Sequence, residues 1–275
     1  QIDRNATADV KIQAHALLGR VYDEQGKTRM ADREYSTVKN SWKDADKMQK
    51  AIMAIPGSKA ANERRLGKTL TAVGEALFYF AEKERAKADA IAMPEYKGKG
   101  DRKDVDSFVK NDIKKWMDKK GPAIKDASKA YLEIVKLRPA PPPRWVIGAG
   151  AAVGKMWGDF VAQFRAAPYP KEWDRDGFVP GTDPPLMWAE LRSTYLASLD
   201  AASEPWKRQA KGAYLTCLQY SVKYQYFDED SRSCEEWLSK NYPQEFHLID
   251  EFRGAPTRVN SGLDERPQAL NIDGS

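Results

Sequence analysis

Apolar residues recur at every third or fourth position through most of the chain, which is the spacing of one face of an α-helix. The pattern is clearest in Leu66, Leu70, Val73, Leu77 and Phe80, which fall on one face of a long helix. Similar stripes run through residues 105–116, 145–164, 206–218 and 234–238. No stretch alternates with the period of two that marks a strand, and no Asn-Gly or Asp-Gly turn joins two apolar runs. The pattern therefore predicts an all-α fold.

Proline and glycine divide these helical stretches. Breaks are predicted at residues 56–57, 94–100, 121–122, 139–143 and 168–185. The last of these is rich in Pro, Gly and Asp, which is typical of a long ordered loop or an insertion. Beyond residue 253 the apolar periodicity is weak, so residues 254–275 are predicted to form an extended or disordered tail.

A repeat built from helix pairs is indicated in the N-terminal part. The residues that match the tetratricopeptide unit of about 34 residues are Leu18, Gly19, Tyr22, Gly26, Ala31 and Tyr35. Small Gly19 and Ala31 would let two antiparallel helices approach, and the tyrosines would fill the space between pairs. Partial matches follow at Ala127, Tyr131, Ile134 and Pro139, and at Gly154 and Trp157. We expect antiparallel helix pairs stacked as a tetratricopeptide-like solenoid, with a basic part over residues 1–140 and further pairs over residues 141–253.

Charge is distributed unevenly along the chain. Residues 1–140 contain 30 Lys and Arg against 21 Asp and Glu, whereas residues 141–275 contain 15 against 19. The basic half could attract an acidic protein, an anionic lipid surface or nucleic acid, although solvated helix faces explain most charge runs. No apolar run approaches the roughly 20 residues that cross a bilayer, so no membrane span is expected. No signal peptide is recognisable either.

Residues suited to catalysis or metal binding are scarce. His15 and His247 are the only histidines, and the chain contains neither a phosphate-binding glycine motif nor the HExxH motif of zinc proteases. A helical enzyme such as a transglycosylase would need a catalytic glutamate. Glu75 or Glu82 could be nominated, but no flanking motif supports either. We therefore expect no catalytic residue, no metal site and no cofactor.

Two stretches resemble a known family of proteins. They are PAPPPRWVIGAGAAVGKMWGDFVAQFRAAPYP at residues 139–170 and WKRQAKGAYLTCLQYSVKYQYFDEDSRSCEEWLSKNYPQEF at residues 206–246. Their Pro-Arg-Trp helix start, Ala-Pro-x-Pro stop and Ser-Arg-Ser-Cys-Glu-Glu-Trp-Leu helix are similar to the C-terminal regions of envelope tetratricopeptide proteins of myxobacteria and relatives. That family includes proteins associated with adventurous gliding motility. The resemblance covers residues 100–252 and implies an exported or periplasmic scaffold within a multiprotein envelope machine.

These features lead to the hypothesis of a non-catalytic scaffold or adaptor that binds other proteins of an envelope complex and no small-molecule substrate. In stacked helix pairs the first helices line the concave face. The expected contact residues are Lys11, His15, Arg20, Arg144, Lys155 and Asp159. The alternative is a binding module for an anionic polymer, either cell-wall glycan or the less favoured nucleic acid, through basic residues 97–120. The expected compartment is the periplasm or envelope, with the cytoplasm as the alternative.

The two cysteines offer a test of compartment. Cys217 and Cys234 lie on consecutive predicted helices, so they could be joined in a disulfide or remain two buried free thiols. If the protein is exported, we expect a disulfide that closes a loop of about 18 residues and stabilises the fold by about 3 kcal/mol. Mass spectrometry of native protein, alkylated before and after reduction, distinguishes the two states. Two alkylated thiols before reduction would contradict the disulfide.

Overall fold

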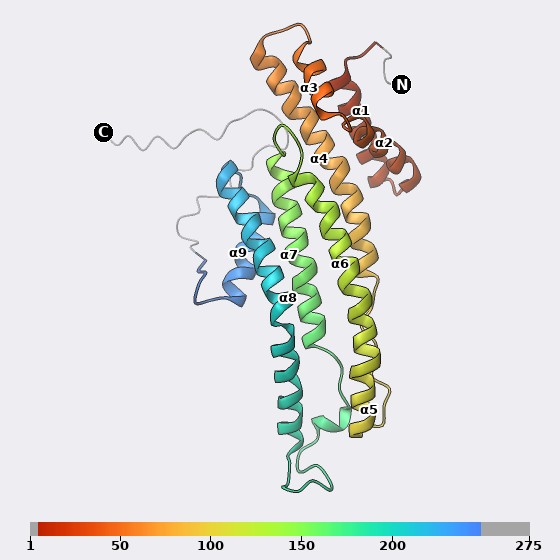
Figure 1. The fold of residues 1–275 in the computed structure, drawn as a ribbon, viewed down its shortest axis with the longest axis vertical. Helices are drawn as coiled ribbons and strands as arrows, with labels where there is room; N and C mark the ends of the chain where they lie inside the picture. Colours follow the sequence, from red (N-terminus) through yellow and green to blue (C-terminus); the bar gives the residue numbers. More distant parts are fainter. Residues whose placement is uncertain (1–4, 249–275) are drawn as a thin grey trace, which may run out of the picture.

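The computed structural model describes residues 5–248, which form an elongated assembly of helices (Figure 1). This part of the chain has no strand beyond one isolated bridge between Phe178 and Met187, so the predicted all-α class is confirmed there. None of its helices is long and apolar enough to cross a membrane. The predicted tail at residues 254–275 lies outside the described residues.

In chain order the elements are α1 (Ala8–Glu24), α2 (Thr28–Ser41), α3 (Ala45–Met53), α4 (Lys59–Asp89), α5 (Arg102–Ser107), a π-helical turn (Phe108–Ile113), α6 (Lys114–Val135), α7 (Pro143–Arg165), a 3-10 turn (Lys171–Asp174), α8 (Trp188–Tyr224) and α9 (Glu229–Asn241).

Four long helices, α4, α6, α7 and α8, form the main bundle (Figure 1). They follow one another in alternating directions, and each packs against the next, while α9 packs against α7 and α8. Helices α1, α2 and α3 pack against α4 at one end of the bundle. Helix α4 has 31 residues and α8 has 37, so each is close in length to a whole tetratricopeptide unit of about 34 residues. The predicted stacking of short helix pairs along the whole chain stays a prediction.

The core of the bundle is built on aromatic side chains at the predicted helical spacing. Phe160 of α7 is buried and contacts Trp116 of α6 and Trp206 of α8, with ring centroids 4.9 and 5.0 Å away. Gly154 permits the close approach of α7 and α8, because a Cβ atom there would lie 2.7 Å from the ring of Tyr214. Stacked and edge-to-face rings add to the stabilisation that apolar burial provides. Helix α7 is therefore the centre of the bundle.

A second core joins α1, α2 and α3 to α4. Its buried side chains are Ile12, Ala16, Ala31, Tyr35, Val38, Trp42, Ile52, Leu66, Leu70, Ala72, Val73 and Ala76. Helices α1 and α2 form an antiparallel hairpin, and Gly26 turns the chain between them with a φ of 69°, which glycine adopts without strain. A Cβ atom at Gly19 would lie 2.9 Å from the ring of Tyr35. Close packing of the hairpin thus requires a small residue where the repeat pattern places one.

The predicted helix break at Gly121 and Pro122 is wrong, because α6 continues through both residues. A proline inside a helix removes one backbone donor and usually kinks or ends the helix. Just beyond it Ile124, Ala127 and Tyr131 are buried on one face, and this packing keeps the segment helical. The other predicted breaks do separate helices, since residues 56–57 precede α4, 94–100 precede α5, 139–143 lead into α7 and 168–185 separate α7 from α8.

Trp157 of α7 provides a test of the central core. It is buried, and its ring meets that of Phe160 edge to face with centroids 6.0 Å apart. We expect Trp157→Ala to lower the free energy of unfolding by about 3–5 kcal/mol, because the surrounding helices cannot refill the cavity. Leu132→Ala on the exposed side of α6 is the control and should change it by less than about 0.5 kcal/mol. Urea unfolding measures both, and a loss below about 1 kcal/mol at Trp157 would place that side chain outside the core.

Candidate protein-binding surface

A buried carboxylate fixes the N-terminal hairpin to the bundle. Glu75 of α4 is only 6% exposed, and its two oxygens accept hydrogen bonds from Nε and Nη2 of Arg20 on α1, at 2.8 and 2.5 Å. The hydroxyl of Tyr35 on α2 donates to Oε1 at 2.9 Å. Burial and the neighbouring Glu75 raise the pKa of Tyr35, which keeps this hydroxyl protonated as a donor. Because a buried carboxylate needs such donors in place of water, Glu75 holds both helices in one orientation.

Two further charged contacts tie the hairpin to α4. Asp32 of α2 accepts hydrogen bonds from the hydroxyl of Tyr79 at 2.8 Å and from Nζ of Lys83 at 2.5 Å. The hydrogen bond from Lys83 lowers the pKa of Asp32, so this carboxylate is charged at neutral pH. In α1, buried Asp9 lies 3.4 Å from Nη1 of Arg65. With several contacts to α4, the hairpin presents one side of α1 outward in a fixed direction.

Helix α1 carries apolar residues on this outward side as well as on its buried side. Val10, Leu17 and Val21 are exposed, and Ala14 between them is half-buried. Successive steps of four, three and four residues place these side chains in a single line along the helix, which we call the outer stripe. Residues that pack into the core, such as Ile12, lie on the opposite side. A helix that is apolar on two sides usually packs against two neighbours, and within the described chain α1 has a neighbour on only one of them.

Two of the predicted contact residues on α1 form contacts within the protein. Nδ1 of His15 lies 2.6 Å from Oε2 of Glu34 on α2, and Arg20 binds Glu75 although its side chain is 52% exposed. Lys11 is half-buried on the same helix. A role for these three residues in binding a partner stays a prediction. The expectation of a concave face on the first helices missed the outer stripe, although its spacing of four, three and four residues is visible in the sequence.

The predicted contact residues on α7 lie apart from those on α1. The guanidinium of Arg144 lies 4.9 Å from the ring centroid of Trp145, and Nζ of Lys155 lies 3.2 Å from Oδ2 of Asp159. Helix α7 packs against α4, α6, α8 and α9, whereas α1 packs against α2, α3 and α4. The structure therefore does not bring the two predicted groups together into one site.

Cys217 of α8 and Cys234 of α9 are joined as a disulfide, and their Cα atoms are 6.8 Å apart. Both residues are fully buried. The rings of Tyr214 and Trp237 stack between the same two helices, with centroids 4.6 Å apart. Of the two arrangements that the sequence left open, the structure has the bridged one, and the bridge attaches α9 to the bundle.

The two glutamates considered for catalysis, Glu75 and Glu82, both accept hydrogen bonds from side chains of neighbouring helices. Glu75 lies in the hairpin interface described above. Oε1 of Glu82 accepts a hydrogen bond from the hydroxyl of Tyr131 on α6 and lies 2.9 Å from Nη1 of Arg85. Burial, followed by the contact with Glu82, raises the pKa of Tyr131, so its hydroxyl remains a donor. Glu75 thus joins α4 to the hairpin, and Glu82 joins α4 to α6.

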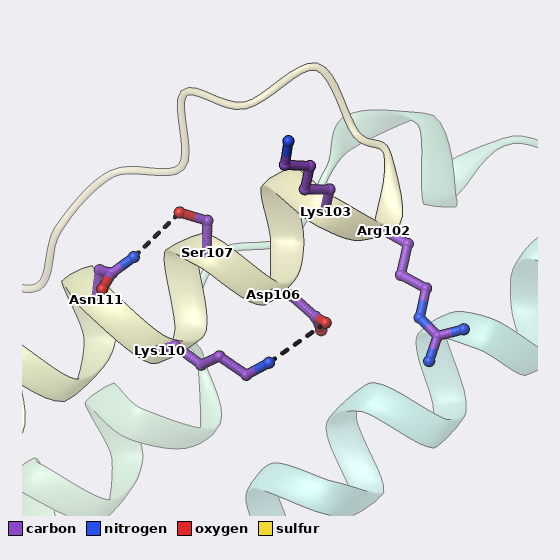
Figure 2. Close-up of a pocket in the computed structure, with 6 residues that line it drawn as sticks. All are labelled: Arg102, Lys103, Asp106, Ser107, Lys110 and Asn111. Atoms are coloured by element: carbon purple, nitrogen blue, oxygen red, sulfur yellow. Dashed lines mark hydrogen bonds and ion pairs between the residues drawn. The ribbon is translucent and has the colours of Figure 1, made fainter.

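A shallow depression of about 540 Å³ lies on the basic segment of residues 97–120 (Figure 2). It is lined by Arg102, Lys103, Asp106, Ser107, Lys110 and Asn111. Nζ of Lys110 lies 3.6 Å from Asp106, and the Asn111 amide donates to the Ser107 hydroxyl at 3.1 Å. All six residues come from α5 and the π-helical turn that follows it. The depression therefore lies along one continuous charged helical segment, and its lining residues all come from that segment.

Neither a group of metal ligands in the described residues nor a known relative identifies a site. Residues 5–248 contain no group of three or more His, Cys, Asp or Glu side chains that could hold a metal ion. Comparison with protein families, with characterised proteins and with solved structures finds no match to this chain. Function must therefore be inferred from the chemistry of the surfaces, among which the outer stripe of α1 is the most distinctive.

The buried contact at Glu75 predicts a specific effect on stability. Glu75→Gln keeps the shape of the side chain but removes the charge that binds Arg20, so we expect the free energy of unfolding to fall by about 1–3 kcal/mol. Arg20→Gln should cost less, because its guanidinium is half exposed and water can replace part of the contact. The double variant should lose less than the sum of the two single losses. Urea unfolding of all three measures this coupling, and strictly additive losses would show that the pair is not coupled.

Proposed function

We propose that this protein is a non-catalytic scaffold that binds other proteins through its N-terminal hairpin. The proposal depends on the outer stripe of α1, whose central Leu17 is 57% exposed while the opposite side of the helix packs into the core. Contiguous apolar residues on a charged surface are typical of interaction sites. Each Å² of apolar surface removed from water contributes about 25 cal/mol, so a partner that covers the stripe gains affinity.

The ion pairs that hold α1 against α4 favour the same function. The contacts of Glu75 with Arg20 and of Asp9 with Arg65 hold α1 against α4. Turning α1 to bury the stripe would separate these charged groups, and a carboxylate left unpaired in the interior is costly. A surface that is already held in its binding conformation loses little conformational entropy when a partner docks.

We further propose that the scaffold is of tetratricopeptide type and belongs to a bacterial envelope assembly, such as one for gliding motility. The tight packing of Gly19 against Tyr35 supports a helix pair of this type at the N-terminus. The disulfide between Cys217 and Cys234 supports a periplasmic or other oxidising location, because such bonds persist mainly there. The partners would then be other proteins of the same envelope complex.

A second candidate function is the binding of an anionic polymer, with cell-wall glycan favoured over nucleic acid. One observation favours it, since Arg102 and Lys103 on α5 are exposed and form no ion pair within the described chain. Other lysines of the same segment are paired with Asp or Glu, which reduces its net field. Polymer binding through many charges would weaken steeply as the salt concentration rises, whereas apolar docking on α1 would not.

Photo-crosslinking tests the scaffold proposal in cells that express the native protein. With p-benzoylphenylalanine in place of Leu17, irradiation should give a discrete crosslinked protein product that also forms at high salt, because the contact is apolar. The matched control has the same group in place of Leu132, which is 47% exposed on α6, and should not give this product. The same product from both positions, or no product from Leu17, would contradict the proposal.

A further inference from the structure

Three side-chain pairs join α8 to α9, and the disulfide is the middle one. In order along α8 they are Tyr214 with Trp237, Cys217 with Cys234, and Ser221 with Ser231. Successive members are three or four residues apart on each helix, so they lie on one face of it. The residue numbers rise along α8 while they fall along α9, which means that the two helices run antiparallel. Each outer pair therefore lies about one helical turn from the disulfide.

The outer pairs cover the disulfide on two sides. Tyr214 is buried, and its ring stacks on that of Trp237 with centroids 4.6 Å apart. On the other side the hydroxyls of Ser221 and Ser231 lie 2.8 Å apart, and both residues are buried. The backbone N–H of Ser231 also donates to the side chain of Asp228 at 3.0 Å, which caps the start of α9. Contacts on both sides of the bond thus hold α9 against α8.

Helix α7 covers a third side of the disulfide. A Cβ atom at Gly150 would lie 3.0 Å from Cα of Cys217, and one at Gly158 would lie 3.0 Å from Nε1 of Trp237. Glycine at these two positions lets α7 lie directly against both α8 and α9, which also pack against each other (Figure 1). Cys217 and Cys234 are each 0% exposed. The two sulfur atoms are thus enclosed among three helices.

Reduction of the disulfide requires direct access to a sulfur atom. A thiolate of a dithiol reductant attacks one sulfur along the S–S axis, forms a mixed disulfide with it and releases the other cysteine as a thiolate. The second thiol of the reductant then displaces the first cysteine and closes a cyclic disulfide. The protein gains two electrons and two protons, and the dithiol loses the same number. Because both cysteines are fully buried, neither sulfur is open to attack while the three helices stay packed.

Opening of α9 is the smallest movement that exposes the sulfur atoms. Helix α9 has 13 residues, and a helix of this length is only marginally stable without tertiary contacts. Helices α7 and α8, by contrast, share the aromatic core of the main bundle. Proteins open locally in such small units at a lower free energy than the whole chain unfolds. Access to the bond therefore arises first from local opening of α9.

We infer that α9 acts as a gate to its own disulfide, so that a dithiol reduces the bond only while α9 is locally open from α7 and α8. Disulfides that act as redox switches are typically exposed and react in the folded protein. The bond between Cys217 and Cys234 is instead a shielded staple that a reductant does not reach in the closed fold. This inference does not depend on the proposed scaffold function, because the outer stripe lies on α1.

The rate of reduction tests this inference. The full chain is incubated with excess dithiothreitol, samples are quenched and alkylated at intervals, and mass spectrometry counts the modified thiols. We expect the native protein to react at least about 100-fold more slowly than oxidised glutathione, an exposed disulfide, because only the open fraction reacts. Trp237→Ala removes one outer pair and should speed the reaction at least about tenfold. Leu132→Ala, on the exposed side of α6, is the control and should leave the rate unchanged.

Two further variants distinguish local opening from unfolding of the whole chain. Leu238→Ala removes a fully buried side chain of α9 and should also speed reduction at least about tenfold. Ile124→Ala removes a buried side chain of α6, which packs against α4 and α7. This change weakens the bundle but leaves the contacts of α9 in place, so the rate should stay within about twofold of the native one. Circular dichroism and urea unfolding verify that each variant is folded.

Three outcomes would overturn the inference. The first is a native protein that reacts as fast as oxidised glutathione, or that contains two free thiols before reduction. The second is a native rate that both α9 variants leave unchanged. The third is equal acceleration by Ile124→Ala and Leu238→Ala, which would show that access arises from unfolding of the whole chain. None of these outcomes alters the crosslink expected at Leu17, so the scaffold proposal is tested separately.

Discussion

The arrangement of the N-terminal hairpin depends on one buried carboxylate. Removing a charged group from water costs several kcal/mol unless donors replace its hydration, and Glu75 obtains those donors from both helices of the hairpin. Arg20 must therefore face α4, and this sets the rotation of α1 about its own axis. In this orientation Ile12, Ala16 and Gly19 are buried, and Leu17 on the outward side is exposed. The contact at Glu75 therefore holds α1 in the orientation in which the outer stripe is exposed.

Helix α4 connects the two cores of the protein. Its earlier residues belong to the core of the hairpin, its later residues face α6, and Leu77 packs against both cores. An uninterrupted helix of 31 residues is about 45 Å long. The hairpin contacts α4 from Arg65 to Lys83, and in Figure 1 it lies in the upper part of the view, whereas α5 lies near the bottom. The apolar outer stripe and the basic surface of α5 therefore lie on separate parts of one connected framework.

The C-terminal part of the described chain is held by a different kind of constraint. Helix α9 is short, and a short helix is only marginally stable without tertiary contacts. A disulfide and the stacked rings of Tyr214 and Trp237 attach it to α8. Ser221 of α8 and Ser231 of α9 also share a buried hydrogen bond of 2.8 Å. The two ends of the described chain thus use different chemistry, with ion pairs at the hairpin and a covalent bond at α9.

Local features of the sequence predicted the all-α class and parts of the long helices. The three-to-four-residue spacing of apolar residues identifies the long helices, Pro and Gly mark most of their ends, and Gly19 marks a close approach, because each of these effects acts within a few residues. The break expected at Pro122 was wrong because the burial of Ile124 and Tyr131 outweighs the local preference of proline.

Tertiary structure decided which side of each helix meets the core. Helix α1 has two apolar sides, and its sequence does not say which of them is buried. Nor does it show that Glu75, far along the chain, lies beside Arg20. His15 and Arg20 were expected to be contact residues because the first helices of stacked pairs line the concave face, and the fold pairs both with carboxylates of neighbouring helices. Periodicity determines that a helix forms, but the choice of its buried face depends on partners that only the folded chain brings together.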